Sequence, residues 1–225
     1  MVGDSFMKAL LIPVKDPTNA KTRLAEFLSA AERQRLVWAM FEDVSRAVSS
    51  ARVPDQVFLV SSYQPAVERG LALGWEVLIE ESQISESASV DWASGILSER
   101  GFDIVMRLPA DLPIVRGEAI DELLSVELAQ PGALIVPSRE GTGTNALIRR
   151  PPHLFPSRFG PNSFDLHRQE AKRVGVECVT VRNDLVALDI DEPADLELLM
   201  EKGPGTSTYE ALIEMGAFER LSNTR

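Results

Sequence analysis

Three aspartates follow apolar runs of the sequence, at positions where their carboxylates could bind a cation. Asp111 lies in "RLPADLPIV", and Asp189 and Asp191 lie in "LVALDIDEP". Carboxylate oxygens suit Mg²⁺, which takes few protein carboxylates and completes its shell with substrate oxygens. Such ions bridge phosphate oxygens and offset the charge that develops in an in-line phosphoryl transfer. The three aspartates are therefore candidate ligands for one or two Mg²⁺ ions.

Each of these aspartates also has a simpler interpretation. Asp111 lies between two prolines that stop both strand and helix, and it could bond to its own backbone as a turn residue. Residues 185–190 are expected to form a strand, at whose end Asp189 and Asp191 would point to the same face. A proline then starts a helix, so Asp191 or Glu192 could instead cap that helix. Both interpretations stay open.

Three cations follow the first apolar run. Lys15, Lys21 and Arg23 fall within nine residues of "PVKDPTNAKTRL", in a chain that is otherwise acidic. Lysine would meet triphosphate oxygens as a point charge and arginine as a fork. The alternative is a solvated loop whose cations merely precede a helix. The segment is not a Walker A loop, because G-x-x-x-x-G-K-[ST] is absent.

Two further segments could bind an anion. "REGTGTNALIRR" places Thr142 and Thr144 two residues apart, so that both hydroxyls can face one ligand, and Asn145 follows them. "FGPNSFDLH" places Gly160 and Ser163 at the start of a helix, where free N–H groups and the helix dipole favour a phosphate. Ser163 as a simple N-cap is the alternative.

The sequence does not indicate a zinc site or catalysis by histidine or cysteine. The chain has two histidines and one cysteine, so we expect no zinc site and no Cys-His or Ser-His-Asp constellation. His167 is expected to be a surface or packing residue rather than a base. Cys178 lies in a valine-rich segment and is expected in the core. A single cysteine excludes an intrachain disulfide and is compatible with a reducing compartment.

The composition limits the class of protein. With 225 residues, of which 44% are hydrophobic, the chain is long enough to bury a sizeable core. Its net charge of −11 argues against nucleic-acid binding, which depends on cationic contacts to phosphates. No apolar run approaches the roughly 20 residues of a membrane-spanning helix. The N-terminal segment lacks the basic region and cleavage site of a signal peptide, so we expect a cytoplasmic protein without membrane partners.

Apolar runs alternate with segments of helical periodicity along most of the chain. This alternation predicts an α/β fold with a mainly parallel sheet and helices on both faces. Ligands of such sheets bind beyond the carboxyl ends of the strands, where the candidate residues lie. One domain is expected over residues 1–225, with a core of about 7–200 and a C-terminal helical extension of about 204–222. The expected strands are 7–14, 55–62, 75–81, 102–111, 132–138, 145–150, 176–182 and 185–190, and the expected helices are 29–48, 65–74, 90–101, 117–129, 163–175, 193–203 and 207–221.

Four segments resemble, in the same order, those of a known enzyme family. "PVKDPTNAKTRL", "LPADLPIV", "GTGTNAL" followed by "FGPNSFDLH", and "LDIDEPADL" are similar to the 2-phospholactate / phosphoenolpyruvate guanylyltransferases of coenzyme F(420) biosynthesis, over about residues 8–200. The family is related to nucleotidyltransferases that act on sugar phosphates and molybdopterin. The resemblance implies a Rossmann-like three-layer α/β/α sandwich with a mixed, mostly parallel sheet, of the nucleotide-diphospho-sugar transferase type.

The resemblance also implies an activity and the roles of individual residues. The activity would be Mg²⁺-dependent transfer of GMP from GTP to the phosphate of 2-phospho-L-lactate, phosphoenolpyruvate or 3-phosphoglycerate, with release of pyrophosphate. Lys21 and Asp111 would be catalytic. The remaining expected roles are metal binding by Asp111, Asp189 and Asp191, contacts to GTP by Lys15, Lys21, Arg23, Ser87 and Ser89, and acceptor binding by Thr142, Thr144, Asn145, Gly160 and Ser163.

The chain departs from the family pattern after the third expected strand. There the family has a Gly-x-Asn-x-Ala stretch close to the nucleotide base, whereas this chain has "ISESASVDWAS". Ser87, Ser89 and Asp91 could supply hydrogen bonds to a base, and selectivity for guanine stays open.

Two other function classes stay open as well. An A-type glycosyltransferase also uses a D-x-D metal site on a Rossmann-like sheet, and a degenerate relative could bind a nucleotide without catalysis. The C-terminal tail is expected to serve packing or a homodimer. The resemblance further implies functional coupling to the downstream deazaflavin transferase.

Overall fold

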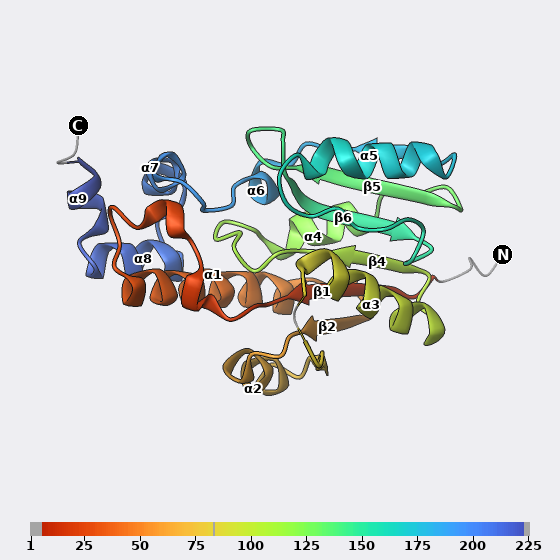
Figure 1. The fold of residues 1–225 in the computed structure, drawn as a ribbon, viewed down its shortest axis with the longest axis horizontal. Coiled ribbons are helices and arrows are strands. Elements are labelled where there is room, and N and C mark those ends of the chain that lie inside the picture. The colour runs from red at the N-terminus through yellow and green to blue at the C-terminus, as the bar shows by residue number, and fades with distance from the viewer. Residues whose placement is uncertain (1–5, 83, 223–225) are drawn as a thin grey trace.

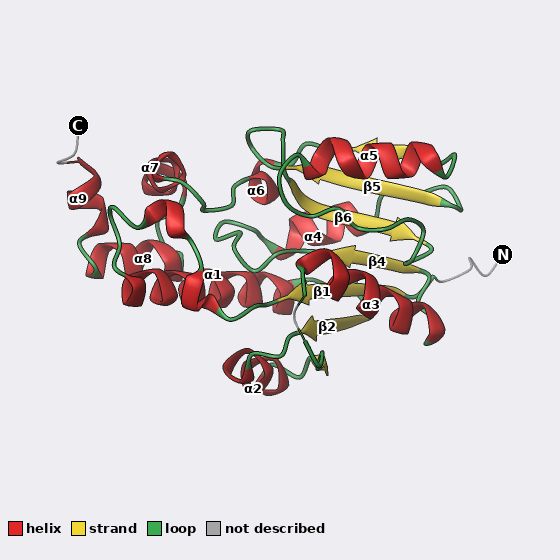
Figure 2. Ribbon diagram, in the orientation of Figure 1, coloured by secondary structure: helices red, strands yellow, loops and turns green. Residues whose placement is uncertain are grey.

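A seven-stranded sheet forms the centre of the molecule (Figures 1 and 2). The computed structural model describes residues 6–82 and 84–222, so residues 1–5, 83 and 223–225 of the expected domain lie outside it. The strands are β1 (Lys8–Pro13), β2 (Gln56–Val60), β3 (Glu76–Leu78), β4 (Ile104–Arg107), β5 (Gly132–Pro137), β6 (Thr144–Arg150) and β7 (Cys178–Thr180). Their order across the sheet is β3-β2-β1-β4-β6-β5-β7.

Strand β6 runs antiparallel to both of its neighbours, β4 and β5, and the other pairs of described strands are parallel. The mixed, mostly parallel sheet expected from the sequence is confirmed. The turn between β5 and β6 is tight, because Gly143 N–H donates to Ser138 Oγ at 2.9 Å. A Cβ added at Gly143 would lie 2.9 Å from that same oxygen, so a larger residue there would displace the Ser138 hydroxyl. The reversal brings the start of β6 to the edge where β1 and β4 end.

Helices cover both faces of the sheet (Figure 2). Alternate residues of β1 point to opposite faces. Leu10 and Ile12 pack against α1 and α4, whereas Ala9 and Leu11 pack against α3. Helix α5 covers β5 and β6 on the side of α3. The helices are α1 (Ala30–Ser50), α2 (Gln64–Ala72), α3 (Glu86–Glu99), α4 (Gly117–Leu124), α5 (Ser163–Arg173), α6 (Asp184–Ala187), α7 (Pro193–Lys202), α8 (Ser207–Glu214) and α9 (Ala217–Ser222).

The expected strand over 185–190 is wrong. Residues 184–187 form the short helix α6, and an irregular segment follows it. Two asparagine side chains explain the difference. Asn183 caps the start of α6 by accepting from Leu185 N–H at 3.0 Å, and the Asn145 amide donates to the carbonyl oxygens of Val186 and Ala187, each at 2.9 Å. The alternating apolar residues of this segment therefore do not belong to the sheet.

Three expected helices differ from the structure by more than two residues at one end or by a break. Helix α3 begins four residues early, because Ser85 caps it by accepting from Ala88 N–H at 3.1 Å. Helix α4 ends at Leu124 instead of continuing to 129. The expected helix 207–221 is divided into α8 and α9 at Gly216, whose φ of 64° lies in the left-handed region.

The C-terminal extension packs against one end of α1 (Figure 1). Leu212 of α8 and Leu221 of α9 share an apolar cluster with Leu36 of α1. The buried Asp43 carboxylate accepts from the N–H groups of Ser207 and Thr208, at 2.7 and 2.8 Å, and so anchors the start of α8. The expected packing role of this segment is confirmed. Among the described residues, no helix combines the length and apolarity that crossing a membrane would require.

Candidate functional site

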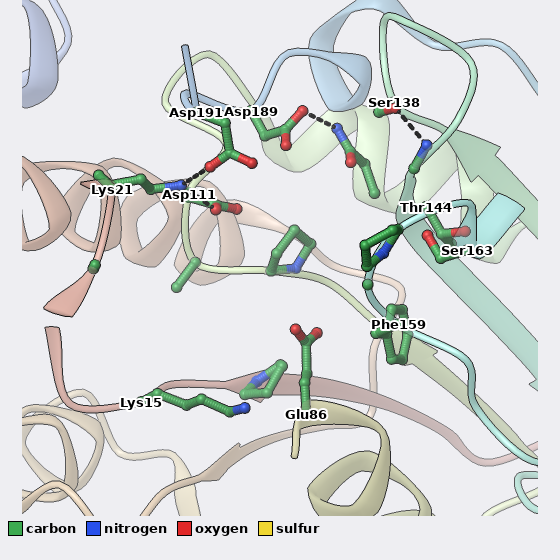
Figure 3. A pocket seen from close by; sticks show the side chains of 18 of the residues that line it. Lys15, Lys21, Glu86, Asp111, Ser138, Thr144, Phe159, Ser163, Asp189 and Asp191 are labelled. Atoms are coloured by element: carbon green, nitrogen blue, oxygen red, sulfur yellow. Dashed lines mark hydrogen bonds and ion pairs between the residues drawn. The ribbon is translucent and has the colours of Figure 1, made fainter. Parts of the chain in front are cut away.

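A cavity of about 640 Å³ lies at the edge of the sheet where β1 and β4 end and β6 begins (Figure 3). Its lining comes from the loops after β1 and β4, the β5–β6 turn, the segment before α5, and the segment after α6. This is the edge at which α/β sheets bind ligands. Figure 3 shows Lys21 and the three aspartates on one side of the cavity, and Thr144, Phe159 and Ser163 on the other.

Lys21 binds two of the three aspartates. Its Nζ donates to Asp111 Oδ2 and to Asp191 Oδ1, each at 2.7 Å, and its side chain is 8% exposed. Burial alone would lower the pKa of Lys21, but the two carboxylates outweigh burial and raise this pKa above its usual value. The ammonium group therefore stays charged. The interaction joins segments that lie 90 and 170 residues apart in the sequence.

The backbone around the cavity is unusual in two places. Lys21, with a φ of 53°, and Asn162, with a φ of 58°, are the two non-glycine residues in the left-handed region within residues 6–82 and 84–222. Both line the cavity. The left-handed conformation costs an L-residue roughly 1–2 kcal/mol, and such conformations cluster at binding and catalytic sites.

The helix-cap alternative holds for Glu192 and not for Asp191. Glu192 is the N-cap of α7 and forms a capping box with Asp195. The Asp195 carboxylate accepts from the backbone N–H groups of Asp191 and Glu192, at 3.0 and 2.8 Å. The carboxylate of Asp191 is thereby left to bind Lys21.

Within the described part of the chain, Asp189 is the one aspartate of the three that forms no ion pair. Burial, followed by the nearby charge of Asp111, raises the pKa of Asp189 to about 7, and the hydrogen bond from Asn145 only partly opposes this rise. For Asp111, burial also works against the charged form, but Lys21 and Arg107 hold its pKa below the ordinary value. The cluster therefore carries more negative charge than Lys21 alone balances.

We expect the Asp189→Asn variant to be more stable than the parent at neutral pH and equally stable in acid. The pKa of Asp189 is about 7 in the folded chain, against an ordinary value of 3.8. The folded chain thus binds more protons than the unfolded chain between these values, so stability falls as pH rises through that window. Asparagine removes the penalty, which we expect to be about 4 kcal/mol at pH 8, or on the order of 8–16 °C in Tm.

Thermal unfolding without metal, measured at pH 4.5 and pH 8, checks this expectation. Glu177→Gln, which removes one exposed carboxylate from the surface between α5 and β7, is the matched control. A Tm difference between Asp189→Asn and the parent that is the same at both pH values would contradict the assignment of excess charge to Asp189.

The three aspartates do not form a ready-made metal centre. In the described part of the chain, no group of three or more His, Cys, Asp or Glu side chains is arranged to hold an ion. Lys21 lies between Asp111 and Asp191 instead. The donor set nevertheless fits Mg²⁺, because its oxygens are hard ligands and Asp189 has uncompensated charge. Mg²⁺ takes the rest of its shell from water and substrate.

The opposite side of the cavity presents hydroxyl groups. Thr144 and Ser163 are buried and line the cavity. The expectation of free amides at the start of α5 is wrong for its first two residues, because Ser163 N–H donates to Gly160 O and Phe164 N–H donates to Thr142 O, each at 3.1 Å. Ser163 is not the N-cap either, since Asn162 occupies that position. The hydroxyls of Thr144 and Ser163 therefore remain as groups that this wall can offer to a ligand.

The structure brings most of the expected site residues to one cavity. Lys15, Arg23, Thr142 and Gly160 line it together with the residues described above. Arg23 is exposed and pairs with Glu192 at 2.9 Å. Lys15 is also exposed.

Three of the expected residues have structural contacts instead. The Asn145 amide lines the cavity but bonds to α6 and, at 3.1 Å, to Asp189. Ser87 and Ser89 do not line the cavity. Ser87 Oγ accepts from Phe159 N–H at 2.8 Å, and Ser89 Oγ donates to Glu80 at 2.6 Å. Contacts of Ser87 and Ser89 with a nucleotide stay a prediction.

Sequence reasoning missed Arg107 and Glu86. Arg107 is 6% exposed, lines the cavity and forms an ion pair with Glu86, and its guanidinium lies 4.2 Å from the centre of the Phe159 ring. It also donates to the carbonyl oxygens of Thr144 and Asn145, at 3.2 and 3.3 Å. The one signal available in the sequence was an arginine inside an apolar strand, "IVMRLP".

Comparison with known proteins gives a consistent result. Residues 7–224 match the family described as guanylyl transferase CofC like. The chain is 31% identical to a phosphoenolpyruvate guanylyltransferase of Thermobaculum terrenum, with 95% of this chain and 92% of the relative covered. It is 33% identical to a 2-phospho-L-lactate guanylyltransferase of Methanothermobacter thermautotrophicus (90% and 88%), and 30% identical to a 3-phospho-D-glycerate guanylyltransferase of Colwellia psychrerythraea (84% and 90%).

The fold is shared with solved structures as well. A protein of Desulfovibrio desulfuricans, described as a nucleotide-diphospho-sugar transferase, superposes with a TM-score of 0.77 at 19% identity, with 96% of this chain and 97% of that chain covered. The nucleotide-diphospho-sugar transferase type of fold expected from the sequence is thereby confirmed. Sequence match, fold and relatives agree that this chain belongs to the CofC-like guanylyl transferase family.

Proposed function

We propose that the chain transfers GMP from GTP to the phosphate of a small phospho-carboxylic acid and releases pyrophosphate. The observation that carries the proposal is the cavity at the sheet edge. It holds an ammonium group and three aspartates on one side, and two buried hydroxyls on the other. This division suits a reaction between a triphosphate bound with a metal and a second, smaller anion.

The reaction requires no general base. The acceptor phosphate is already an anionic nucleophile at neutral pH, so catalysis consists of positioning and charge stabilisation. Lys21, fixed between Asp111 and Asp191, would stabilise the charge on the α-phosphate and the leaving pyrophosphate. Lys15 and Arg23, both exposed at the cavity mouth, would contact the outer phosphates.

We further propose that Asp111, Asp189 and Asp191 hold Mg²⁺ together with the phosphates of GTP. The support is the uncompensated charge at Asp189 and the hardness of the carboxylate donors. When bound, the ion would neutralise phosphate charge and orient the α-phosphate for in-line attack. The protein side chains hold the ion, and the substrate completes its shell.

The acceptor would bind at the wall formed by Thr144, Gly160 and Ser163. The hydroxyls of Thr144 and Ser163 can donate to its phosphate or carboxylate, and the buried Arg107 lies next to them. The named activities of the relatives support phosphoenolpyruvate, 2-phospho-L-lactate or 3-phosphoglycerate as the acid. A place in coenzyme F(420) biosynthesis, with the product passed to a deazaflavin transferase, is part of this proposal.

A substrate matrix tests the proposed function. GTP, ATP and CTP are each combined with the three acids in the presence of Mg²⁺, and pyrophosphate release is measured. We expect release with GTP and at least one acid, and at least about tenfold less with ATP or CTP. The comparison of nucleotides also tests guanine selectivity, which Ser87 and Ser89 do not explain from their present contacts.

Other outcomes of the matrix separate the alternatives. Tight GTP binding without pyrophosphate release for any acid would favour a non-catalytic nucleotide-binding protein. Turnover of a nucleotide sugar without pyrophosphate release would favour a glycosyltransferase. Either result would overturn the proposal.

A further inference from the structure

His167 is a buried polar residue that touches the wall of the cavity but does not line it. Its side chain is fully buried, and its ring packs edge-on against Phe159, with 4.8 Å between ring centres. Both ring nitrogens have partners. Nε2 lies 2.8 Å from the backbone nitrogen of Arg158, and Nδ1 lies 3.1 Å from Thr144 Oγ1. The expected packing role is thus correct but incomplete.

The partners determine which ring nitrogen carries the proton. A backbone N–H can only donate, so Nε2 must accept from Arg158 and carries no hydrogen. In a neutral imidazole the other nitrogen is then the donor, so Nδ1–H donates. Thr144 Oγ1 and the backbone carbonyl of Ser163 share this single N–H as acceptors.

The surrounding charges keep the ring neutral. Burial, followed by the nearby guanidinium groups of Arg149 and Arg107, lowers the pKa of His167 to about 3, against smaller opposite effects of the Ser163 carbonyl and Asp91. A charged ring would carry a proton on Nε2, which would face the Arg158 N–H. The ring therefore stays in this single neutral tautomer at neutral pH.

The direction of this bond determines what Thr144 can do. Its hydroxyl accepts from Nδ1–H, so its own proton is available for another acceptor. Within residues 6–82 and 84–222, the Thr144 hydroxyl has no further hydrogen-bond partner, and Thr144 lines the cavity beside Ser163 (Figure 3). A hydroxyl that donated to the protein would instead present lone pairs to the cavity and repel an anion.

We propose that His167 is a positioning residue for the acceptor acid: held by the Arg158 N–H, its ring donates to Thr144 Oγ1 and so directs the Thr144 hydroxyl proton at the anionic group of the acid. The inference rests on the proposed function and names a determinant of acceptor affinity within it. Hydrogen bonds to charged groups are among the stronger ones, so misdirecting this proton should weaken acid binding about tenfold.

Two substitutions of His167 separate the positioning role from a structural one. His167→Asn keeps a donor at the place of Nδ1 and loses the acceptor for Arg158. His167→Gln keeps an acceptor at the place of Nε2 and loses the donor to Thr144. Both lose a hydrogen bond of the buried ring, and Asn also removes one heavy atom more than Gln, so a purely structural role would make His167→Asn the more damaging change.

We expect His167→Gln to raise the KM for phosphoenolpyruvate, or for whichever of the three acids the parent uses, about tenfold. The KM for GTP and kcat should change less than threefold, and His167→Asn should recover most of the affinity for the acid. Thr144→Val should weaken acid binding to a similar extent. The double variant Thr144→Val/His167→Gln should lose little more, because both changes remove the same donated proton.

Calorimetric binding of the same acid to each variant gives a readout that is independent of turnover. Equal effects of Asn and Gln on the affinity for the acid, or additive effects of the Thr144 and His167 changes, would overturn the positioning role even if the parent transfers GMP. If the parent neither transfers GMP nor binds any of the three acids, the proposed function fails, and the inference fails with it.

Discussion

Replacing Asp111 with asparagine is expected to lower the rate of guanylyl transfer by about 10³-fold while the chain stays folded. Asp111 is one of the two carboxylates that hold Lys21, and it is a proposed ligand of Mg²⁺. Asparagine keeps the shape of the side chain but loses its charge, so both the ammonium group and the ion lose a partner. The rate is measured as pyrophosphate release from GTP with the best acid of the substrate matrix.

The control for this variant is Asp165→Asn on α5, whose side chain is 72% exposed and only loosely paired with Arg168, at 3.9 Å. It should retain the parent rate. Thermal unfolding of Asp111→Asn should show a cooperative transition, which separates loss of chemistry from loss of fold. Pyrophosphate release within about threefold of the parent would contradict the assignment of Asp111 to the reacting phosphates.

Replacing Lys21 with methionine should have two opposite effects. Turnover should fall by about 10²- to 10³-fold, because the charge on the phosphates loses its fixed ammonium partner. Binding of Mg²⁺ without nucleotide should become tighter, because Asp111 and Asp191 are released from their bonds with Lys21. Methionine keeps most of the length of the lysine side chain. It must adopt the same left-handed backbone conformation as Lys21, whose φ is 53°.

Stability of the Lys21→Met variant distinguishes these effects. Breaking a buried ion pair by removing one partner costs roughly 3–5 kcal/mol, so the metal-free variant should unfold at a lower temperature than the parent. Mg²⁺ should then raise the Tm of the variant more than that of the parent. A variant that turns over normally while folded, or whose Tm responds to Mg²⁺ less than that of the parent, would argue that Lys21 has only a structural role.

Most helices and strands could be predicted from the sequence, because their starts and ends depend on residues that are close together in the chain. The capping box at Ser29 and Glu32 is present, and it starts α1 where the periodicity placed it. Pro65 and Gly74 bracket α2 as expected. The prediction of a strand over 185–190 failed, because the conformation of this segment depends on Asn145, about forty residues away. The alternation of apolar residues within the segment carries no information about a hydrogen bond from a distant side chain.

The same distinction applies to the site. Lys21 and Asp111 could be predicted as members of one site, because they follow β1 and β4 and these strands end at one sheet edge. Asp191 lies in the same site, but the segment before it is not a strand of the sheet, so the argument that placed it there was wrong. Their mutual ion pairs could not, because these join segments up to 170 residues apart. The contact of Ser87 with the backbone of Phe159 could not be predicted either, because these residues lie 72 positions apart.

The contribution of His167 depends on the direction of a single proton. Residue type and spacing place a histidine inside α5 and predict a packing role. They carry no information about the Arg158 N–H, which makes Nε2 an acceptor and Nδ1 a donor. These groups meet only in the folded chain, where Thr144 of β6 and the backbone of Arg158 both contact the ring of His167 in α5.

The mass of the reaction product tests the central claim most directly. The chain is incubated with GTP, Mg²⁺ and each of the three phospho-acids, and the products are identified by mass spectrometry while pyrophosphate is quantified. The account predicts a product that contains one GMP and one intact acid, formed in equal amount with pyrophosphate and abolished by removal of divalent cations. Release of inorganic phosphate instead of pyrophosphate, or the absence of a GMP adduct with every acid, would contradict it.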